Sequence, residues 1–379
     1  AVMPDRLQPR VRGRPAGLDD AAAAAAELLL AARLPLIYGL IESTVEAQRR
    51  AVELADLVGG AVDTAASAGH AAAVYGFERV GHLGATLGEL RTRADLVVYW
   101  GIDPEERHPG FHARYAAPAP GAPPRAVVAV DLDGARGPAE AEERLALPAA
   151  REVEALWALQ ALLRGRRLEP ARVEAAGLPL DGLRRLAGRL RGSRYAVVVY
   201  DGDPPPERRG PLRGVALAAL AEAAGPAARV RLLAVRLPGN PVGAEAVLAW
   251  QTGYPCAVHF GAGHPRYGPE EFSGEALLAR GDADAALVVG ADPARHLSAA
   301  ARRRLAEIPV AVVGPADGRL DGAAVQVPTA PAEATPGGVY RFDGVPLRRR
   351  VRPPAAPTEA DVLARIVEAV RARGAGGGR

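Results

Sequence analysis

Residues 34–64 read LPLIYGLIESTVEAQRRAVELADLVGGAVDT and predict one complete strand–helix–strand unit. Leu36–Gly39 is a short apolar strand, Ser43–Leu57 has apolar residues at helical spacing, and Ala61–Asp63 is the next strand. Two strands joined through a helix in this way are parallel, and the crossover between them is right-handed. The stretch therefore predicts a parallel sheet covered by helices.

The same alternation continues through the rest of the chain. Further strands are expected at residues 96–100, 126–131, 195–200, 230–235, 285–290, 310–313 and 324–327, and further helices at residues 18–33, 152–163, 183–190, 212–224, 299–307 and 358–371. We therefore expect an α/β fold made of Rossmann-like parallel sheets. At the start of helix 43–57, Ser43 or Thr44 followed by Glu46 is typical of a capping box.

The composition bounds the class of protein. The chain has 379 residues, of which 49% are hydrophobic and 24% charged, with a formal net charge of +3. That length suggests two or three domains at ~100–200 residues each, and the apolar fraction excludes a disordered chain. Aromatic residues make up only 4%, so the stacking platforms of single-strand nucleic-acid-binding proteins are not expected. No stretch approaches the ~20 apolar residues of a membrane span, and no signal peptide is recognisable. We therefore expect a cytoplasmic protein without nucleic-acid or membrane partners.

Cys256 is the single cysteine of the chain. One cysteine excludes an intramolecular disulfide, and it excludes a cysteine-ligated iron–sulfur cluster or a cysteine-rich zinc site built from this chain alone. His259 follows three residues later, which leaves a nucleophile–base pair open. A small buried hydrophobic residue is the ordinary interpretation of such a cysteine.

All 47 basic residues are arginine. Two short runs stand out, Arg302–Arg304 and Arg348–Arg350. Such runs indicate solvated faces, or contacts to an acidic partner or an anion.

Several expected strands run directly into loops of Gly, Asp and Pro. These loops are Gly101–Pro104, Asp201–Asp203 and Gly290–Pro293. In an open parallel sheet, ligands bind beyond the carboxyl ends of the strands, so the three loops are the candidate ligand rim. The alternative is that Gly and Pro only end the strands. His108 and His112 have the spacing of a metal-binding pair on a helix, but Pro109 and Gly110 lie between them and break that helix.

Read as a linear pattern over roughly residues 30–370, the chain resembles the B subunit of formylmethanofuran dehydrogenase, a member of the molybdopterin oxidoreductase superfamily. The segments that carry the resemblance include 37–39, 43–48, 63–70, 86–89, 93–95, 99–104, 108–109, 114–115, 250–255, 265–267, 281–285, 290–293, 308–310, 328–330 and 340–346. Their order and spacing carry the resemblance, and no single segment would.

The resemblance implies a site with specific residues missing. Family members reduce carbon dioxide to formate at a tungsten or molybdenum pterin, with a [4Fe–4S] cluster and a metal-ligating Cys followed by His. Here Gly69 stands where that Cys is expected, His70 remains, and Arg266 matches a family motif. Glycine has no thiolate to hold a soft metal. The resemblance therefore implies vestigial active-site positions at Gly69, His70 and Arg266, no catalytic residue, no metal ligand, and neither the pterin nor the cluster.

The cofactor loops of the family are matched at six positions. They are Gly101, Asp103, Pro104, Gly290, Asp292 and Pro293. By the same resemblance, we expect these loops to be vestiges of contacts to the pterin dinucleotide.

The resemblance also implies the domain organisation. We expect an irregular segment at residues 1–17, a first Rossmann-like domain at 18–63 plus 240–345, an inserted Rossmann-like domain at 64–239, and a C-terminal segment at 346–379 with a helix at 358–371. This would be a molybdopterin-oxidoreductase-like core that lacks the iron–sulfur domain and the C-terminal barrel cap.

Three functional hypotheses remain open at this stage. The first is a non-redox structural subunit of a bacterial formyltransferase/hydrolase complex, with amidohydrolase, formyltransferase and C-type subunits as partners. The second is a redox-active B subunit of formylmethanofuran dehydrogenase. The third is a module that binds a methanofuran-like carrier in the former pterin cleft, through arginines such as Arg91, Arg93, Arg107, Arg114 and Arg266.

Overall fold

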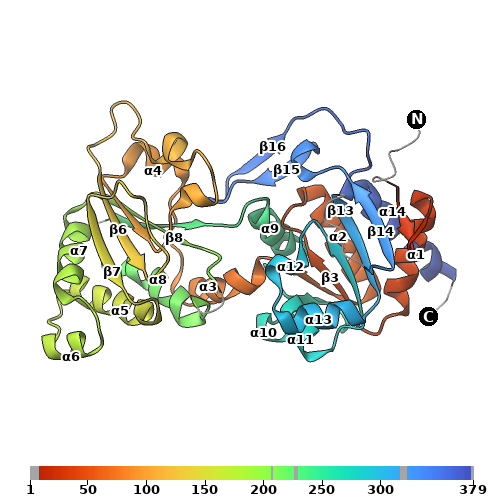
Figure 1. Cartoon of the computed structure of the whole chain (residues 1–379), viewed down its shortest axis with the longest axis horizontal. Coiled ribbons are helices and arrows are strands. Elements are labelled where there is room, and N and C mark those ends of the chain that lie inside the picture. Colours follow the sequence, from red (N-terminus) through yellow and green to blue (C-terminus); the bar gives the residue numbers. More distant parts are fainter. Residues whose placement is uncertain (1–7, 206–207, 226–228, 316–321, 377–379) are drawn as a thin grey trace. The chain divides into compact units, whose positions relative to one another are not determined.

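The computed structural model describes residues 8–205, 208–225, 229–315 and 322–376 (Figure 1). The chain divides into two compact units. The first unit is Ala1–Ala68 with Pro238–Arg379, and the second unit is Gly69–Leu237. Each unit has its own sheet and its own apolar core, so the predicted α/β fold with parallel sheets is confirmed.

The first unit is built on a nine-stranded sheet. Its order is β11-β10-β4-β3-β12-β13-β14-β1-β2. The bounds are β1 Arg10–Val11, β2 Arg14–Pro15, β3 Pro35–Gly39, β4 Ala61–Thr64, β10 Val258–His259, β11 Arg266–Tyr267, β12 Ala285–Val289, β13 Val310–Pro315 and β14 Val325–Thr329. The five central strands, from β4 to β14, are parallel. The chain builds the sheet outward from β3 in both directions, so the switch point lies between β3 and β12.

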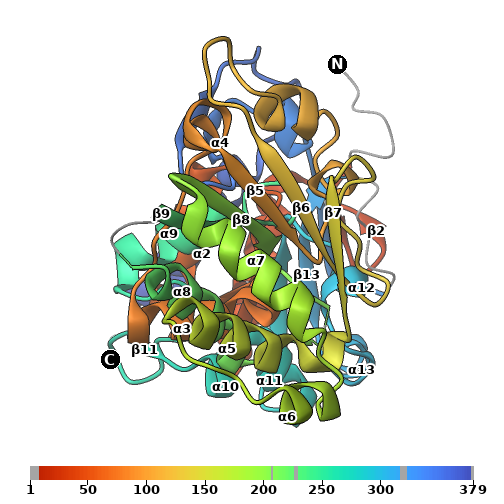
Figure 2. The same ribbon diagram turned by 90° about the vertical axis from the view of Figure 1, so that its left-hand side faces the viewer.

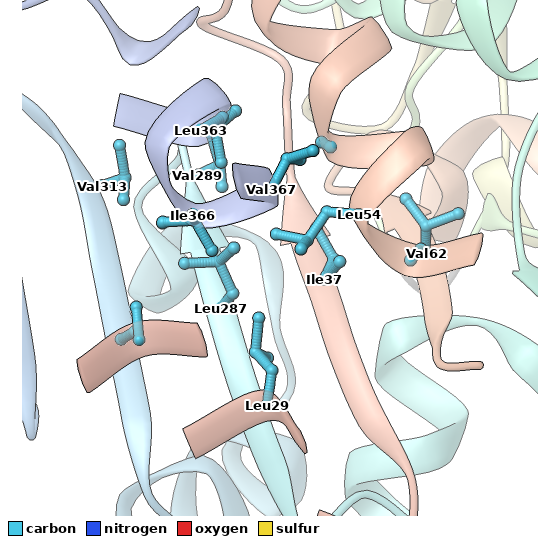
Figure 3. Close-up of a cluster of buried hydrophobic side chains, with 14 of the residues drawn as sticks. Leu29, Ile37, Leu54, Val62, Leu287, Val289, Val313, Leu363, Ile366 and Val367 are labelled. Carbon is cyan, nitrogen blue, oxygen red and sulfur yellow. The ribbon is translucent and has the colours of Figure 1, made fainter. Parts of the chain in front are cut away.

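Helices cover both faces of this sheet. α1 (Leu18–Ala31), α2 (Val45–Val58), α9 (Pro241–Thr252) and α14 (Glu359–Gly376) share one apolar core with the strands. Figure 3 shows Ile37 and Leu287 of the sheet beside Leu54 of α2 and Ile366 of α14. Each such side chain contributes about 1.5–3 kcal/mol on full burial. Successive strand residues point to opposite faces, and α11 (Gly274–Arg280) packs beside Tyr38 on the other face, together with α13 (Ala299–Glu307).

The N-terminal segment differs from the expectation that residues 1–17 are irregular. β1 and β2 form a hairpin, and β1 pairs antiparallel with β14. Arg12 and Gly13 both have positive φ, +49° and +76°, which suits a two-residue hairpin turn. The backbone groups at the edge of β14 bind β1, and this distant pairing is not visible in the local sequence. Residues 1–7 of that predicted segment, and residues 377–379 of the predicted C-terminal segment, lie outside the described residues.

The second unit is built on a five-stranded parallel sheet of order β7-β6-β5-β8-β9, seen in Figure 2. The strands are β5 Leu96–Trp100, β6 Ala126–Leu132, β7 Glu143–Leu147, β8 Tyr195–Asp201 and β9 Arg229–Val235. The helices are α3 Ser67–Val80, α4 Leu87–Arg93, α5 Glu152–Leu163, α6 Pro170–Ala175, α7 Leu180–Gly192 and α8 Pro211–Ala223. Sheet growth changes direction between β5 and β8, so the switch point lies there.

The remaining elements are short. They are η2 Pro104–Glu106, the π-helix η3 His112–Ala116, η4 Ala149–Arg151, α10 Pro269–Phe272, α12 Pro293–His296, η6 Ala332–Ala334, and a separate hairpin of β15 Gly337–Tyr340 and β16 Pro346–Arg349. Among the described residues, no helix is both long and apolar enough to cross a membrane.

The predicted capping box at the start of α2 is wrong. Thr44 is the N-cap residue, but its side chain accepts no capping hydrogen bond. The Glu46 carboxylate instead accepts a hydrogen bond from the backbone N–H of Gly338 in β15. The carboxylate that the local pattern assigned to the cap therefore binds a backbone group 292 residues away in sequence.

Candidate functional site

The loop after β5 lies beside the switch point of the second unit. Gly101 has a φ of +62°, which favours glycine and turns the chain out of the strand. The Asp103 carboxylate accepts a hydrogen bond from the backbone N–H of Glu105 at 3.0 Å, and His112 Nε2 lies 2.8 Å from the same carboxylate. Pro104 begins the short helix η2. The polar side chain of this loop thus caps its own turn.

The loop after β12 repeats this arrangement in the first unit. Gly290 has a φ of +50°, the Asp292 carboxylate accepts from the Ala294 N–H at 2.9 Å, and Pro293 begins α12. A pocket of about 180 Å³ lies at this carboxyl end of the sheet. Its lining comprises Glu42, Gly290, Ala291, Asp292, Arg295, Val312, Val313, Gly314 and Pro315. Of the three predicted rim loops, this one lines a pocket in its own unit.

Gly69 lies in the first turn of α3 and packs against the loop after β8. A Cβ atom at this position would lie 3.0 Å from Asp203 Cα and 3.3 Å from Asp203 C, both of which are backbone atoms. Such contacts are tighter than ordinary van der Waals distance. A cysteine Cβ would therefore require the loop to shift by a few tenths of an ångström.

His70 is buried beside Gly69 and contacts the same loop. Its Nδ1 lies 3.2 Å from the Gly202 carbonyl, which accepts the hydrogen bond. The ring also makes an edge contact with Phe77, with 6.2 Å between the ring centroids. The side chain thus joins α3 to the loop that follows β8.

Two ion pairs fix the Asp201–Asp203 loop. Arg107 binds the Asp201 carboxylate through both terminal nitrogens, at 2.6 and 2.9 Å. Arg236 binds the Asp203 carboxylate at 2.9 and 3.3 Å, and the side chains of this second pair are each only 3% exposed. Burial alone would raise the pKa of the Asp203 carboxyl, but Arg236 and His70 hold that pKa below its usual value. The predicted ligand rim at this loop is therefore occupied by the chain's own arginines.

A third buried carboxylate extends this network. Glu152, at the start of α5, accepts hydrogen bonds from Trp100 Nε1 at 3.0 Å, Arg208 Nε at 3.2 Å and Arg213 Nε at 2.9 Å. Arg213 also donates to the Asp201 carbonyl. Sequence reasoning missed Glu152, because an acidic residue in the first turn of a helix is ordinarily solvated. Glu152 links the carboxyl ends of β5 and β8 from within the core.

A metal held by a thiolate does not fit the second unit at Gly69. Glycine supplies no ligand, and an added Cβ would be in tight contact with the Asp203 backbone. His108 and His112, the other candidate metal-binding pair, have different partners. His108 Nε2 contacts the Arg236 carbonyl, whereas His112 Nε2 contacts the Asp103 carboxylate. Within the described ranges, no three residues among His, Cys, Asp and Glu are placed to hold a metal ion.

Arg266 lies in β11 at the edge of the first unit's sheet. Its side chain is 49% exposed, lies 3.9 Å from Glu271, and stacks over the Phe272 ring at 5.1 Å. Cys256, nearby in sequence, is buried, as expected of a core residue. His259 stacks on Phe272 as well, with centroids 5.1 Å apart.

The other arginines proposed for carrier binding belong to the second unit. Arg91 donates to the Arg114 carbonyl at 3.0 Å, Arg93 lies 3.5 Å from Glu89, and Arg107 is held by Asp201. The structure thus places one of the five candidates in one unit and four in the other.

A buried carboxyl in the first unit was also missed. Glu359 begins α14, and its carboxyl lies behind Gly290, where an added Cβ would be 3.0 Å from Oε1. Burial raises the pKa of Glu359 to about 8, while the nearby Ser43 hydroxyl lowers it and the neighbouring Glu42 raises it. The sequence offers no signal for this burial, since Glu359 follows a Pro-rich stretch as a helix-starting acid would.

Comparison with known proteins gives the family. No family model matches the chain. The chain is 32% identical over 340 residues to the B subunit of the tungsten-containing formylmethanofuran dehydrogenase 2 of Methanocaldococcus jannaschii, covering 87% of this chain and 78% of the relative. The chain belongs to the family of formylmethanofuran dehydrogenase B subunits. This confirms the resemblance inferred from the sequence.

Two further comparisons place the chain near a different member of this family. It is 30% identical over 285 residues to the B subunit of the formyltransferase/hydrolase complex Fhc of Methylorubrum extorquens, covering 75% of each protein. Its structure is similar to a chain in the crystal structure of the formyltransferase/hydrolase complex FhcABCD from the same organism, determined in complex with methylofuran. The TM-score is 0.79 at 26% identity, and the match covers 97% of this chain and 99% of that one.

Proposed function

We propose that the chain is a non-redox structural subunit of a formyltransferase/hydrolase complex. In the proposed complex, formyl-tetrahydromethanopterin is converted to formate through a formylated methanofuran-like carrier, in one-carbon metabolism. The single observation that carries this proposal is Gly69, where the expected ligand is absent and Asp203 occupies the space beside it. A two-electron reduction needs a metal with a ligand set, and this position offers no thiolate.

The residues near Gly69 support a structural role for this part of the second unit. His70, which the family resemblance places at the active site, holds the backbone of the loop after β8. Arg107 and Arg236 neutralise the two aspartates of that loop. A buried pair of this kind contributes to a defined local conformation more than to net stability. We infer that the second unit keeps its shape for its partner subunits, which we expect to include amidohydrolase, formyltransferase and C-type subunits.

A redox-active subunit is the second candidate. The observation in its favour is the 32% identity to a tungsten-containing dehydrogenase subunit. A carrier-binding role is the third, and it draws on the methylofuran in the related complex. In this chain Arg266 is half-exposed and lies over the Phe272 ring, so it is the residue to test for that role.

The experiment is to co-produce the chain with its partner subunits and assay the purified complex for two activities. Release of formate from formyl-tetrahydromethanopterin, without formate-dependent reduction of a viologen dye, supports the proposal. Viologen reduction that requires this chain would establish the redox alternative. Arg266→Glu, compared with Arg229→Glu in the second unit, tests carrier binding: a rise in KM for the carrier confined to Arg266→Glu would support it.

A further inference from the structure

The hairpin of β15 and β16 is attached to the first unit through the backbone of β15, and the Arg349 side chain of β16 donates a hydrogen bond to the Ala332 carbonyl. The Tyr340 N–H of β15 donates to Asn240 Oδ1 at 2.7 Å, and the Gly338 N–H donates to the Glu46 carboxylate at 2.9 Å. A Cβ at Gly338 would lie 3.0 Å from Val45 Cβ of α2, so β15 lies close against that helix. β15 is therefore anchored along the edge that faces away from β16.

The register of the hairpin leaves the other edge of β16 open. The Arg341 N–H donates to the Val345 carbonyl beside the turn, and the ladder pairs Val339 with Leu347 and Gly338 with Arg348. Hydrogen-bonded and non-hydrogen-bonded pairs alternate in an antiparallel ladder. The Gly338–Arg348 pair is thus of the non-hydrogen-bonded kind, which agrees with the Gly338 N–H donating outward. The Arg348 N–H and carbonyl point away from β15, and no hydrogen bond to that N–H is present among the described residues.

The side chains along this edge are basic and exposed. Arg348, Arg350 and Arg352 are exposed, and within the described part of the chain none of them has an ion-pair partner. Leu347 is 48% exposed and Val351 is 38% exposed. Arg341, at the turn of the same hairpin, is by contrast paired with Asp343. Residues 347–352 therefore combine an unpaired backbone edge with three arginines that lack an ion-pair partner in the described ranges and two exposed aliphatic side chains.

We propose that the outer edge of β16, with residues 347–352, is the docking site for an extended acidic segment of another subunit of the complex. Main-chain hydrogen bonds to Arg348 would add a third strand to the hairpin, and the arginines would select carboxylates. Charge complementarity is the reason for an acidic partner. Pro346 and charged side chains are also devices that keep an edge strand from pairing. That alternative predicts no loss of binding when the charges are reversed. The inference rests on the proposed function for the source of the partner.

The test uses co-produced complex, purified through a tag on one of the other subunits. Arg348→Glu combined with Arg350→Glu should lower the amount of this chain retained by at least tenfold at 150 mM salt. Arg348→Pro removes the outward N–H together with the guanidinium, without breaking a ladder bond, whereas Arg348→Ala removes the guanidinium alone. If the edge pairs with another strand, Arg348→Pro should weaken retention more than Arg348→Ala. The matched control is Arg166→Glu combined with Arg167→Glu, two exposed arginines of the second unit, and it should leave retention unchanged.

The outcomes separate this inference from the proposed function. If the charge-reversal variants are retained as well as the wild-type chain, the inference is overturned and the proposed function stands. If the control pair loses retention as the charge-reversal variants do, the effect is a general one of charge, and the inference is also overturned. A wild-type chain that never joins the complex would overturn the proposed function and this inference with it. Thermal unfolding of each variant alone establishes that the chain is folded.

Discussion

Substitution of Gly69 by alanine tests the packing beside the loop after β8. An alanine Cβ would lie 3.0 Å from Asp203 Cα, and the loop cannot yield freely because its carboxylates are paired with Arg107 and Arg236. Overpacking of this kind costs about 1–3 kcal/mol. Replacing glycine by alanine within a helix returns up to about 1 kcal/mol. We therefore expect Gly69→Ala to be neutral or to lower the free energy of unfolding by about 2 kcal/mol.

Gly188→Ala is the matched control, because it measures the stability gained from replacing glycine by alanine in a helix without a packing cost. Gly188 lies in α7 of the same unit, and a Cβ there meets no atom within 4 Å. This variant should gain about 1 kcal/mol. The two variants should thus differ by about 1–3 kcal/mol, which corresponds to roughly 2–12 °C in the midpoint of the second unit's transition.

The assay is differential scanning calorimetry of the full chain, with hydrogen exchange of residues 201–203 as a local readout. Faster exchange in Gly69→Ala, and not in Gly188→Ala, would locate the strain at the loop. Equal stabilisation by both substitutions would refute the tight packing described for Gly69.

Three further substitutions test other parts of the account. Asp203→Asn should lower the free energy of unfolding by about 3 kcal/mol in urea titrations, because Arg236 stays buried without its counter-charge; a loss below about 1 kcal/mol, as for an exposed pair, would contradict this. Glu359→Gln should flatten the pH dependence of stability between about pH 5 and 8: the folded pKa is raised to about 8, so the wild type loses stability as pH rises through that window. Glu368→Gln, at an exposed position of the same helix, should leave the slope intact, and equal slopes in both variants would reject the buried carboxyl. Asn240→Ala should release the β15–β16 hairpin, seen as faster hydrogen exchange at residues 337–349 with little change in the second unit, and unchanged exchange would remove Asn240 as the anchor.

The sequence predicts the regular elements well where the signal is local. The bounds of β5, α5 and α13 agree with the predicted ranges 96–100, 152–163 and 299–307. These segments have strong apolar periodicity and clear end signals, so neighbouring residues alone determine them. The two Gly-x-Asp-Pro loops were also recognisable, since each caps its own turn.

The features that depend on distant partners were not predictable. Glu46 accepts a hydrogen bond from the backbone of β15. Asp201 and Asp203 form ion pairs with Arg107 and Arg236, respectively. Each of these partners is far away in sequence, so no local pattern could show that the loop after β8 is already satisfied. Gly69 was noticed as a missing ligand, but only the structure reveals how closely it packs against the Asp203 backbone.

The most direct test of the central claim is the metal content of the purified complex, produced in medium with both tungstate and molybdate. A tungsten-containing relative of the family, produced in the same way, serves as the positive control. The account predicts that neither tungsten nor molybdenum is bound in proportion to this chain, because Gly69 offers no ligand. One pterin-bound tungsten or molybdenum per chain would contradict it.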